Sequence, residues 1–241
     1  NGLDILLVSR VSMNGKRRQR LIDFAGEHGV VRVGFQGDER FPPETIIQFE
    51  APVVHFGATS MPFPSGAFLQ PSAAGEKALR EAVQLLIPPG AMRIVELFSG
   101  CGAFGIPLAA AGFRVAAYEA EEPMIYAMGQ VAGRADLGGR ISGRVRDLAR
   151  QPVRPEEMDG VDLVLLDPPR NGATAQIEQI ADSDVPAVVY VSCNHVAWVD
   201  QARFLCSPSP KIAGQPFVPV RANGVDLFPH TPHVELVLTF E

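Results

Sequence analysis

The stretch ELFSGCGAFG, residues 96–105, decides the fold, because it joins the end of a short apolar segment to the start of a segment of small residues. Its glycines, Gly100, Gly102 and Gly105, have the spacing G-x-G-x-x-G. Glycines permit a tight turn and let a ligand approach the backbone where a strand passes into a helix. The stretch therefore predicts a strand, a ligand-binding loop and a helix, in that order.

The loop alone leaves its ligand open. Enzymes that bind dinucleotides and enzymes that bind S-adenosylmethionine (SAM) both use this spacing, and a turn that only packs a helix on a sheet also fits it. Glu96 ends the strand before the loop, where an acid suits the cationic methionine end of SAM. Glu119 ends the next predicted strand, where a carboxylate can accept both hydroxyls of a ribose, in SAM or in NAD.

Outward from the loop, short apolar runs alternate with segments that carry Ala, Leu, Ile and Gln at helical spacing. Such runs are typical of strands buried on both faces of a parallel sheet, and the alternation indicates an open α/β sheet. We expect the final segment, residues 233–241, to be an antiparallel closing strand. The predicted parallel strands are residues 92–97, 113–119, 161–167 and 187–193.

The beginning of the chain has a different pattern, with two strand-like runs around a helix and a segment that alternates like a meander. We interpret residues 1–74 as a small α+β subdomain and residues 75–241 as the catalytic domain. A helix over residues 75–90, ended by two prolines and a glycine, connects them.

Composition indicates a soluble globular protein. Of the 241 residues, 46% are hydrophobic and 20% charged, and no apolar run is long enough to span a bilayer. Three cysteines without C-x-x-C spacing argue against a disulfide framework and favour a cytoplasmic location. The net charge is −6. The basic runs at residues 16–20 and 140–150 are interpreted, on charge alone, as solvated faces rather than RNA-binding surfaces.

Two further segments carry chemistry. Asp167 follows a predicted buried strand and precedes two prolines, and Cys193 ends the next strand. A lone cysteine usually packs in a core, but the polar neighbours of Cys193 and a helix that starts just after it favour a reactive thiol with a lowered pKa. A thiolate beside a SAM methyl group suits methylation of a poor carbon nucleophile such as uracil C5. The reaction then needs a base that removes the C5 proton so that the thiolate can leave. We predict Glu235 for this role, with Asp226, His230 and His233 nearby.

Five motifs together resemble the RNA uracil-C5 methyltransferases, which make 5-methyluridine in tRNA and in large-subunit rRNA. The resemblance covers roughly residues 60–241. In chain order the motifs are FLQ (68–70), ELFSGCGAFGIPLA (96–109), DPPRNG (167–172), VSCN (191–194) and DLFPHTPHVELV (226–237).

The resemblance implies a class I SAM-dependent methyltransferase domain, Rossmann-like, with a mostly parallel seven-stranded sheet. It implies SAM as cofactor and RNA, either rRNA or tRNA, as substrate. Cys193 would be the nucleophile that bonds uracil C6, and Glu235 the general base. The implied cofactor contacts are Gln70, Phe98, Gly100, Gly102, Glu119, Asp147 and Asp167.

The sequence departs from the family at Ala103, where an asparagine is usual, and at His195, where a proline is usual. The iron–sulfur cysteines and the N-terminal RNA-binding barrel that many members of the family carry are either upstream of this chain or absent. A zinc site at His230 and His233 is not expected, because their spacing suits no closed structural set. We expect a monomer that does not bind membranes. A non-catalytic SAM- or RNA-binding relative and an NAD-dependent oxidoreductase are the alternatives.

Overall fold

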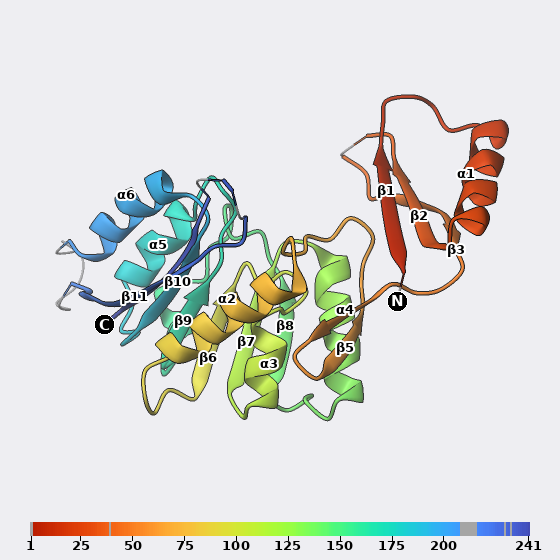
Figure 1. Cartoon of the computed structure of the whole chain (residues 1–241). Coiled ribbons are helices and arrows are strands. Elements are labelled where there is room, and N and C mark those ends of the chain that lie inside the picture. Colours follow the sequence, from red (N-terminus) through yellow and green to blue (C-terminus); the bar gives the residue numbers. More distant parts are fainter. Residues whose placement is uncertain (1, 39, 208–215, 229, 232) are drawn as a thin grey trace. The chain divides into compact units, whose positions relative to one another are not determined.

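The computed structural model describes the whole chain except residues 1, 39, 208–215, 229 and 232. The chain divides into two compact units, Asn1–Phe68 and Leu69–Glu241 (Figure 1). The division lies between residues 68 and 69, whereas the sequence placed it between 74 and 75. No helix among the described residues is long and apolar enough to cross a bilayer.

The first unit is a small sheet with one helix, plus a hairpin. Strand β1 pairs with β2 in parallel and β2 pairs with β3 in antiparallel, while β4 and β5 form a separate antiparallel hairpin. The helix α1 begins at an asparagine cap, Asn14, which accepts a hydrogen bond from the Arg17 N–H at 3.0 Å. The elements are β1 (Leu3–Val8), α1 (Gly15–Glu27), β2 (Val30–Gln36), β3 (Glu44–Gln48), β4 (Val53–Phe56) and β5 (Thr59–Pro62).

The second unit is built on a seven-stranded sheet in the order β11-β12-β10-β9-β6-β7-β8. Strands β6 to β10 run parallel to one another, and β12 runs antiparallel to both β10 and β11. The helices are α2 (Ala73–Leu86), α3 (Gly105–Ala110), α4 (Glu122–Arg134), the 3-10 helix η1 (Pro155–Met158), α5 (Thr174–Ala181) and α6 (His195–Leu205). The strands are β6 (Arg93–Leu97), β7 (Arg114–Glu119), β8 (Ile141–Val145), β9 (Leu163–Leu166), β10 (Val188–Ser192), β11 (Pro219–Val225) and β12 (Glu235–Phe240).

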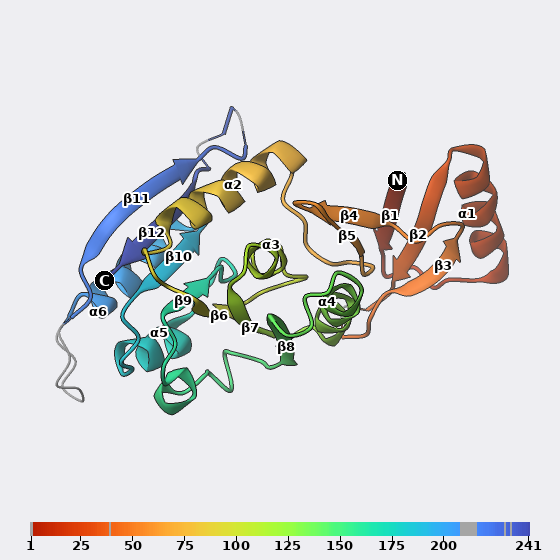
Figure 2. The ribbon, with the colours of Figure 1, turned by 90° about the horizontal axis from the view of Figure 1, so that it is seen from below.

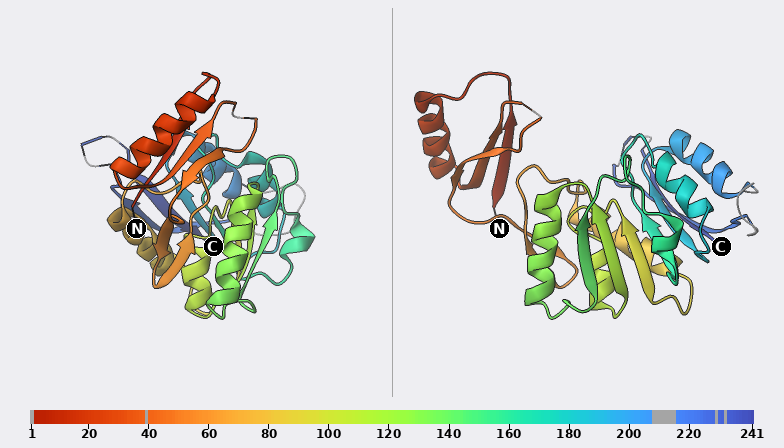
Figure 3. Two further views of the ribbon diagram at one scale, coloured as in Figure 1. Left: turned by 90° about the vertical axis from the view of Figure 1, so that its right-hand side faces the viewer. Right: turned by 180° about the vertical axis from the view of Figure 1, so that it is seen from behind.

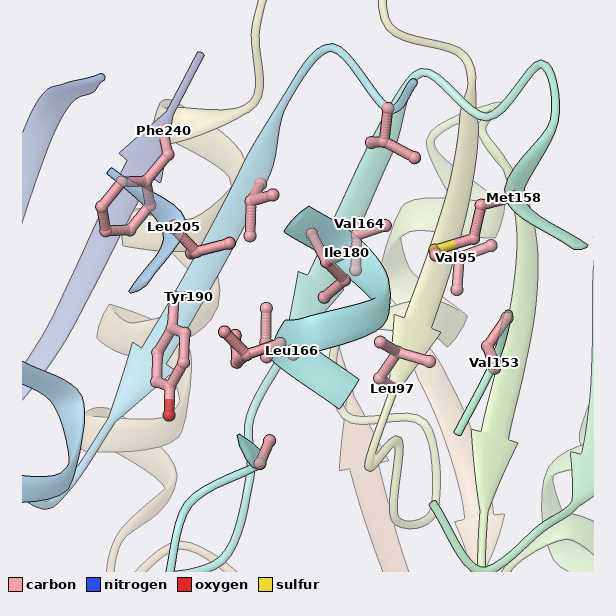
Figure 4. Close-up of a cluster of buried hydrophobic side chains, with 14 of the residues drawn as sticks. Val95, Leu97, Val153, Met158, Val164, Leu166, Ile180, Tyr190, Leu205 and Phe240 are labelled. Carbon is pink, nitrogen blue, oxygen red and sulfur yellow. The ribbon is translucent and has the colours of Figure 1, made fainter. Parts of the chain in front are cut away.

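Helices cover both faces of this sheet. The helices α2, α3 and α4 lie on one face, and α5 and α6 lie on the other (Figure 2). Figure 4 shows the core on the α5–α6 face, where Leu166, Ile180 and Tyr190 pack together. On the opposite face, the Thr239 hydroxyl of β12 donates a hydrogen bond to the Leu86 carbonyl at 2.9 Å and ties α2 to the sheet.

The predicted α/β class is confirmed, and so is the antiparallel closing strand. The predicted strands correspond to β6, β7, β9, β10 and β12. The sequence did not single out β8 and β11, which form the two edges of the sheet. Four of the five residues of β8 are exposed, so this strand lacks the continuous apolar run that marks the buried strands.

Candidate active site

The sequence-predicted residues meet along one edge of the seven-stranded sheet. The carboxyl ends of parallel strands lie at the same edge, and β12 begins there because it runs in the opposite direction. Following the sheet order from β12 to β8, the edge carries Glu235, Cys193, Asp167, the glycine loop with Phe98, Glu119 and Asp147. Neighbouring strands are about 4.8 Å apart, so Cys193 is about 10 Å from the loop that follows β6.

Cys193 and Glu235 face each other through strand register. Ser192 on β10 is paired with Leu236 on β12, so the next position of the antiparallel ladder brings Cys193 opposite Glu235. On the other side of β10, Tyr190 is paired with Leu166 of β9, and Asp167 follows directly. The Glu235 side chain is buried and that of Cys193 is partly buried. The sheet thus places a thiol between two carboxyl groups.

These groups influence one another electrostatically. Burial and then the negative charge of Glu235 raise the pKa of Asp167 to about 7, although part of that residue is exposed. The pKa of the Cys193 thiol is also raised, first by burial and then by the charges of Glu235 and Asp167, while Arg170 opposes the shift. The prediction that a helix N-terminus lowers this pKa is therefore wrong for the free protein, because burial and the two carboxylates outweigh it.

Asn194 joins the two loops that carry Asp167 and Cys193. Its side-chain amide donates a hydrogen bond to the Arg170 carbonyl at 2.8 Å, and its side-chain oxygen accepts one from the Val196 N–H at 3.1 Å. The Asn194 N–H also donates to the Ser192 hydroxyl at 3.2 Å. Sequence reasoning noted Asn194 only as a polar neighbour. Its contact with Arg170 spans a sequence separation that no local pattern could indicate.

The glycine loop is held open by its backbone. Phe98, Gly100 and Gly102 all have positive φ angles, of 60°, 53° and 87°. A Cβ on Gly100 would meet no atom within 4 Å, so the outer side of the loop has room for a ligand. On Gly105 a Cβ would lie 2.1 Å from a Glu96 carboxyl oxygen, so the start of α3 needs glycine for space.

Glu119 anchors this loop. One carboxyl oxygen accepts the Gly100 N–H at 2.9 Å, and the other accepts the N–H groups of Ala120 at 2.7 Å and Glu121 at 3.1 Å. A carboxylate has about four acceptor positions, so these bonds occupy most of them. A ribose that uses both of its hydroxyls would have to share an acceptor with the backbone.

Glu96 lies beneath the glycine loop, only 1% exposed, rather than at the open edge. Its Oε1 accepts the Gly105 N–H at 3.1 Å, and its Oε2 has no hydrogen-bond partner among the described residues. Burial, together with the charges of Asp167 and Glu119, raises its pKa to about 8, although the Gly105 hydrogen bond opposes the shift. The side chain is therefore protonated at neutral pH and supports the loop from below.

The other two predicted cofactor residues lie on segments that follow β8 and precede α2. Asp147 follows β8 and is exposed, and its Oδ1 accepts the N–H groups of Ala149 and Arg150 at 3.0 and 3.2 Å. Gln70 lies partly buried in the irregular segment before α2.

The remaining candidates have structural surroundings. Burial raises the pKa of the Cys101 thiol to about 12. Cys206 and Trp198 pack against the core on the α5–α6 face. His233 lies edge-on to Phe228, and His230 is exposed. Within the described part of the chain, no group of three His, Cys, Asp or Glu side chains is close enough to hold a metal ion.

No protein-family model matches the chain. A protein of Caulobacter vibrioides named as an RNA methyltransferase is 37% identical over 240 residues, which are 99% of this chain and 54% of that protein. The 23S rRNA (uracil(1939)-C(5))-methyltransferase RlmD of Aeromonas hydrophila is 32% identical over 93% of this chain and 49% of its own length. The chain thus spans about half the length of these curated relatives.

Among solved structures, the tRNA (uracil-54, C5)-methyltransferase of Pyrococcus abyssi, in complex with S-adenosyl-L-homocysteine, matches with a TM-score of 0.70. The two chains are 22% identical, and the match covers 88% of this chain and 51% of that one. This likeness shows that the two share a fold, and it confirms the predicted class I methyltransferase architecture.

We predict that Glu96→Gln changes the pH dependence of stability. The pKa of Glu96 is about 8 in the folded protein against an ordinary value of 4.5, so the folded state keeps a proton that the unfolded chain loses. Its contribution to stability is complete below about pH 4.5 and is lost as the pH rises through about 8, by on the order of 1 kcal/mol per pH unit.

Urea unfolding at a series of pH values measures this effect. Between about pH 5 and 8, the free energy of unfolding should fall with rising pH less steeply in Glu96→Gln than in the parent. Asp167, whose pKa is also raised, lowers the free energy of unfolding with rising pH in both proteins. Glu122→Gln, an exposed change in the first turn of α4, is the matched control and should keep the parent slope. Equal slopes in parent and Glu96→Gln would show that Glu96 is ionised in the folded protein.

Proposed function

The chain is homologous to bacterial proteins named RNA methyltransferases, and on this premise we propose that it transfers a methyl group from SAM to C5 of a uridine in RNA. The observation that carries the proposal is the register of β10 and β12, which sets Cys193 opposite Glu235 beside the glycine loop. One relative acts on uracil C5 of rRNA, and the structural neighbour is named for uracil C5 of tRNA, so either RNA class is a candidate substrate.

The residues at the carboxyl edge fit SAM. Gly100 leaves open space at the loop, and Glu119, whose carboxylate accepts the Gly100 N–H, is the proposed ribose-binding residue. Phe98 lies at the start of the loop, partly buried against the core. We assign Gln70, Phe98, Gly100, Gly102, Glu119, Asp147 and Asp167 to the SAM site. When bound, SAM supplies a methyl group on a positively charged sulfur.

The nucleophile makes C5 reactive. The thiolate sulfur of Cys193 forms a bond to uracil C6, and the electrons of the C5–C6 double bond move onto the O4 carbonyl as an enolate. C5 of this enolate then accepts the methyl group. Because the pKa of the Cys193 thiol is raised in the free protein, the thiol needs help to lose its proton. The positive charge of Arg170 lowers that pKa, as does a backbone hydrogen bond at Cys193, so both favour the thiolate.

The base completes the reaction. Glu235 removes the proton from the methylated C5, the electrons of that bond restore the C5–C6 double bond, and the carbon–sulfur bond to Cys193 breaks. A carboxylate directly across the strand pair from the nucleophile is placed for this step. The hydrogen bond of 2.8 Å from the Asn194 side-chain amide to the Arg170 carbonyl joins the loop that carries Cys193 to the loop that carries Asp167.

Formation of 5-methyluridine in RNA tests the function directly. Incubation with SAM and a uridine-containing RNA, followed by nucleoside analysis, should yield 5-methyluridine. A protein that binds SAM or RNA without catalysis would yield none. An oxidoreductase would bind NADH in preference to SAM.

We predict that Glu119→Ala weakens SAM binding by about tenfold to a hundredfold, because it removes a charged hydrogen-bond acceptor and frees the Gly100 N–H. Isothermal calorimetry measures the affinity. Glu121→Ala, two residues away and exposed, removes the same charge without that contact and should bind SAM as the parent does. Unchanged affinity in Glu119→Ala would place the ribose elsewhere.

We predict that Cys193 forms a covalent adduct with RNA containing 5-fluorouridine. Fluorine cannot leave as a proton, so the enzyme–RNA bond should persist and shift the protein band on a denaturing gel. Cys193→Ala should show no shifted band, and Cys206→Ala, which changes a partly buried cysteine in the core, should still show it. A shifted band with Cys193→Ala would rule out this nucleophile.

We predict that Glu235→Gln stalls after methyl transfer, because adduct formation and methylation precede loss of the C5 proton. Turnover should fall by about 10²–10⁴-fold, the usual contribution of a general base. The accumulated species should be protein joined to methylated, otherwise ordinary RNA, and it should disappear in the double variant with Cys193→Ala.

His233→Asn is the comparison for the base, because His233 is the nearest competing residue in the sequence. It is exposed, whereas Glu235 is buried. If His233→Asn accumulates the methylated adduct while Glu235→Gln turns over normally, then the base is His233 and the assignment to Glu235 is wrong.

A further inference from the structure

One face of the second unit carries a basic depression away from the proposed active site. The helices α3 and α4 pack on the other face of β7 and β8, so these strands face the viewer in the right-hand view of Figure 3. A depression of about 430 Å³ lies on this face, and Glu157 of η1 contributes to its lining. Four arginines contribute to its lining: Arg93, Arg114, Arg140 and Arg144.

Three of these arginines form a row across adjacent strands. Arg93 is paired with Arg114 in the β6–β7 ladder, and the Val115 N–H donates to the Arg140 carbonyl at 2.7 Å just before β8 begins. Neighbouring strands are about 4.8 Å apart, and like charges opposite each other in a sheet are destabilising. A row of this kind has a cost for the free protein that a bound polyanion would offset.

The nearby carboxylates already have hydrogen-bond partners. Glu157 lines the depression but is held by Arg146, at 2.7 and 2.9 Å, and this pairing lowers its pKa to about 2. Asp162 accepts the N–H groups of Met92 and Arg93, and the Arg93 guanidinium is 4.0 Å away. Among the described residues, Arg114 and Arg140 have no ion-pair partner.

Two other polar residues of the lining, Arg144 and Ser142, suit a phosphate ligand. Arg144 lies over the Tyr118 ring, 5.9 Å from its centroid, so its side chain is supported beside the depression. The exposed Ser142 provides a hydroxyl donor on the same strand. Tyr118 itself is only 3% exposed, which leaves no aromatic face here for stacking on a base. The chemistry therefore favours contacts with a backbone rather than with bases.

We propose that the row of Arg93, Arg114 and Arg140, together with Arg144, binds the phosphodiester backbone of the RNA substrate at a site distinct from the catalytic edge. The arginines themselves indicate a polyanionic ligand, and the choice of RNA as that polyanion rests on the proposed function. The arginines of the row stand at the amino ends of β6, β7 and β8, and the catalytic edge is formed by the carboxyl ends. The RNA therefore has to extend about 15 Å along the sheet, the length of a five-residue strand, to reach both.

The double variant Arg114→Gln with Arg140→Gln tests this site. Its affinity for a fluorescently labelled hairpin RNA, measured by anisotropy with the whole 241-residue chain, should be about tenfold lower than that of the parent. The slope of log affinity against log salt concentration should become shallower by about 0.7–0.9 for each lost phosphate contact. SAM affinity should stay at the parent value, and the thermal melting temperature should be at or above that of the parent, because the variant relieves the repulsion within the row. Both results would show that the fold is intact.

The matched control is the double variant Arg134→Gln with Arg203→Gln. It makes the same change in net charge on α4 and α6, away from the depression. It should keep the parent affinity and salt slope. An equal loss in both double variants would overturn the proposal, because net charge alone would then explain the binding. Parent-like RNA binding by the Arg114 and Arg140 variant would overturn it as well.

Two further outcomes separate this inference from its alternatives. Poly-glutamate that displaces the labelled RNA as well as unlabelled RNA does would assign the depression to an acidic polypeptide and overturn the proposal. The proposed methylation can fail independently: an RNA affinity that depends on Arg114 and Arg140, without formation of 5-methyluridine, would leave the binding site in place and reject the chemistry.

Discussion

The reversed direction of β12 is the constraint on which the candidate active site depends. The other strands between β10 and β8 run parallel and bring only their carboxyl ends to the shared edge. A further parallel strand would have brought its last residue there, whereas β12 brings its first, Glu235. The backbone ladder with β10 then fixes the position of Glu235 opposite Cys193. Hydrogen bonds between main chains thus determine the relative position of two side chains that are far apart in the sequence and are proposed to act together.

The central strands could be predicted because they are buried on both faces. The runs that form β9 and β10 are continuous and apolar, so the sequence alone places Asp167 and Cys193 at strand ends. The edge strands could not be predicted in this way, because exposure gives β8 a polar sequence around Arg144. The direction of the Cys193 pKa shift was also missed, because the sequence does not show how far the thiol is buried, and burial contributes more to the raised pKa than the charges of Glu235 and Asp167 do.

Two buried acids lie close to where SAM is proposed to bind. Burial raises the pKa of Glu96 to about 8 and that of Asp167 to about 7, so each is neutral or partly neutral near physiological pH. A positively charged sulfonium nearby would favour their ionised forms, since opposite charges stabilise each other. Cofactor binding and the loss of protons from this edge are therefore linked by the same electrostatics that govern the free protein.

The division of the chain after Phe68 separates the first unit from all residues that have a proposed role in the reaction. Every residue assigned to the reaction and to SAM, from Gln70 to Glu235, belongs to the second unit, which also holds the row of arginines. The first unit contributes its own sheet, helix and small core. Its surface can therefore accumulate substitutions without altering any of these side chains.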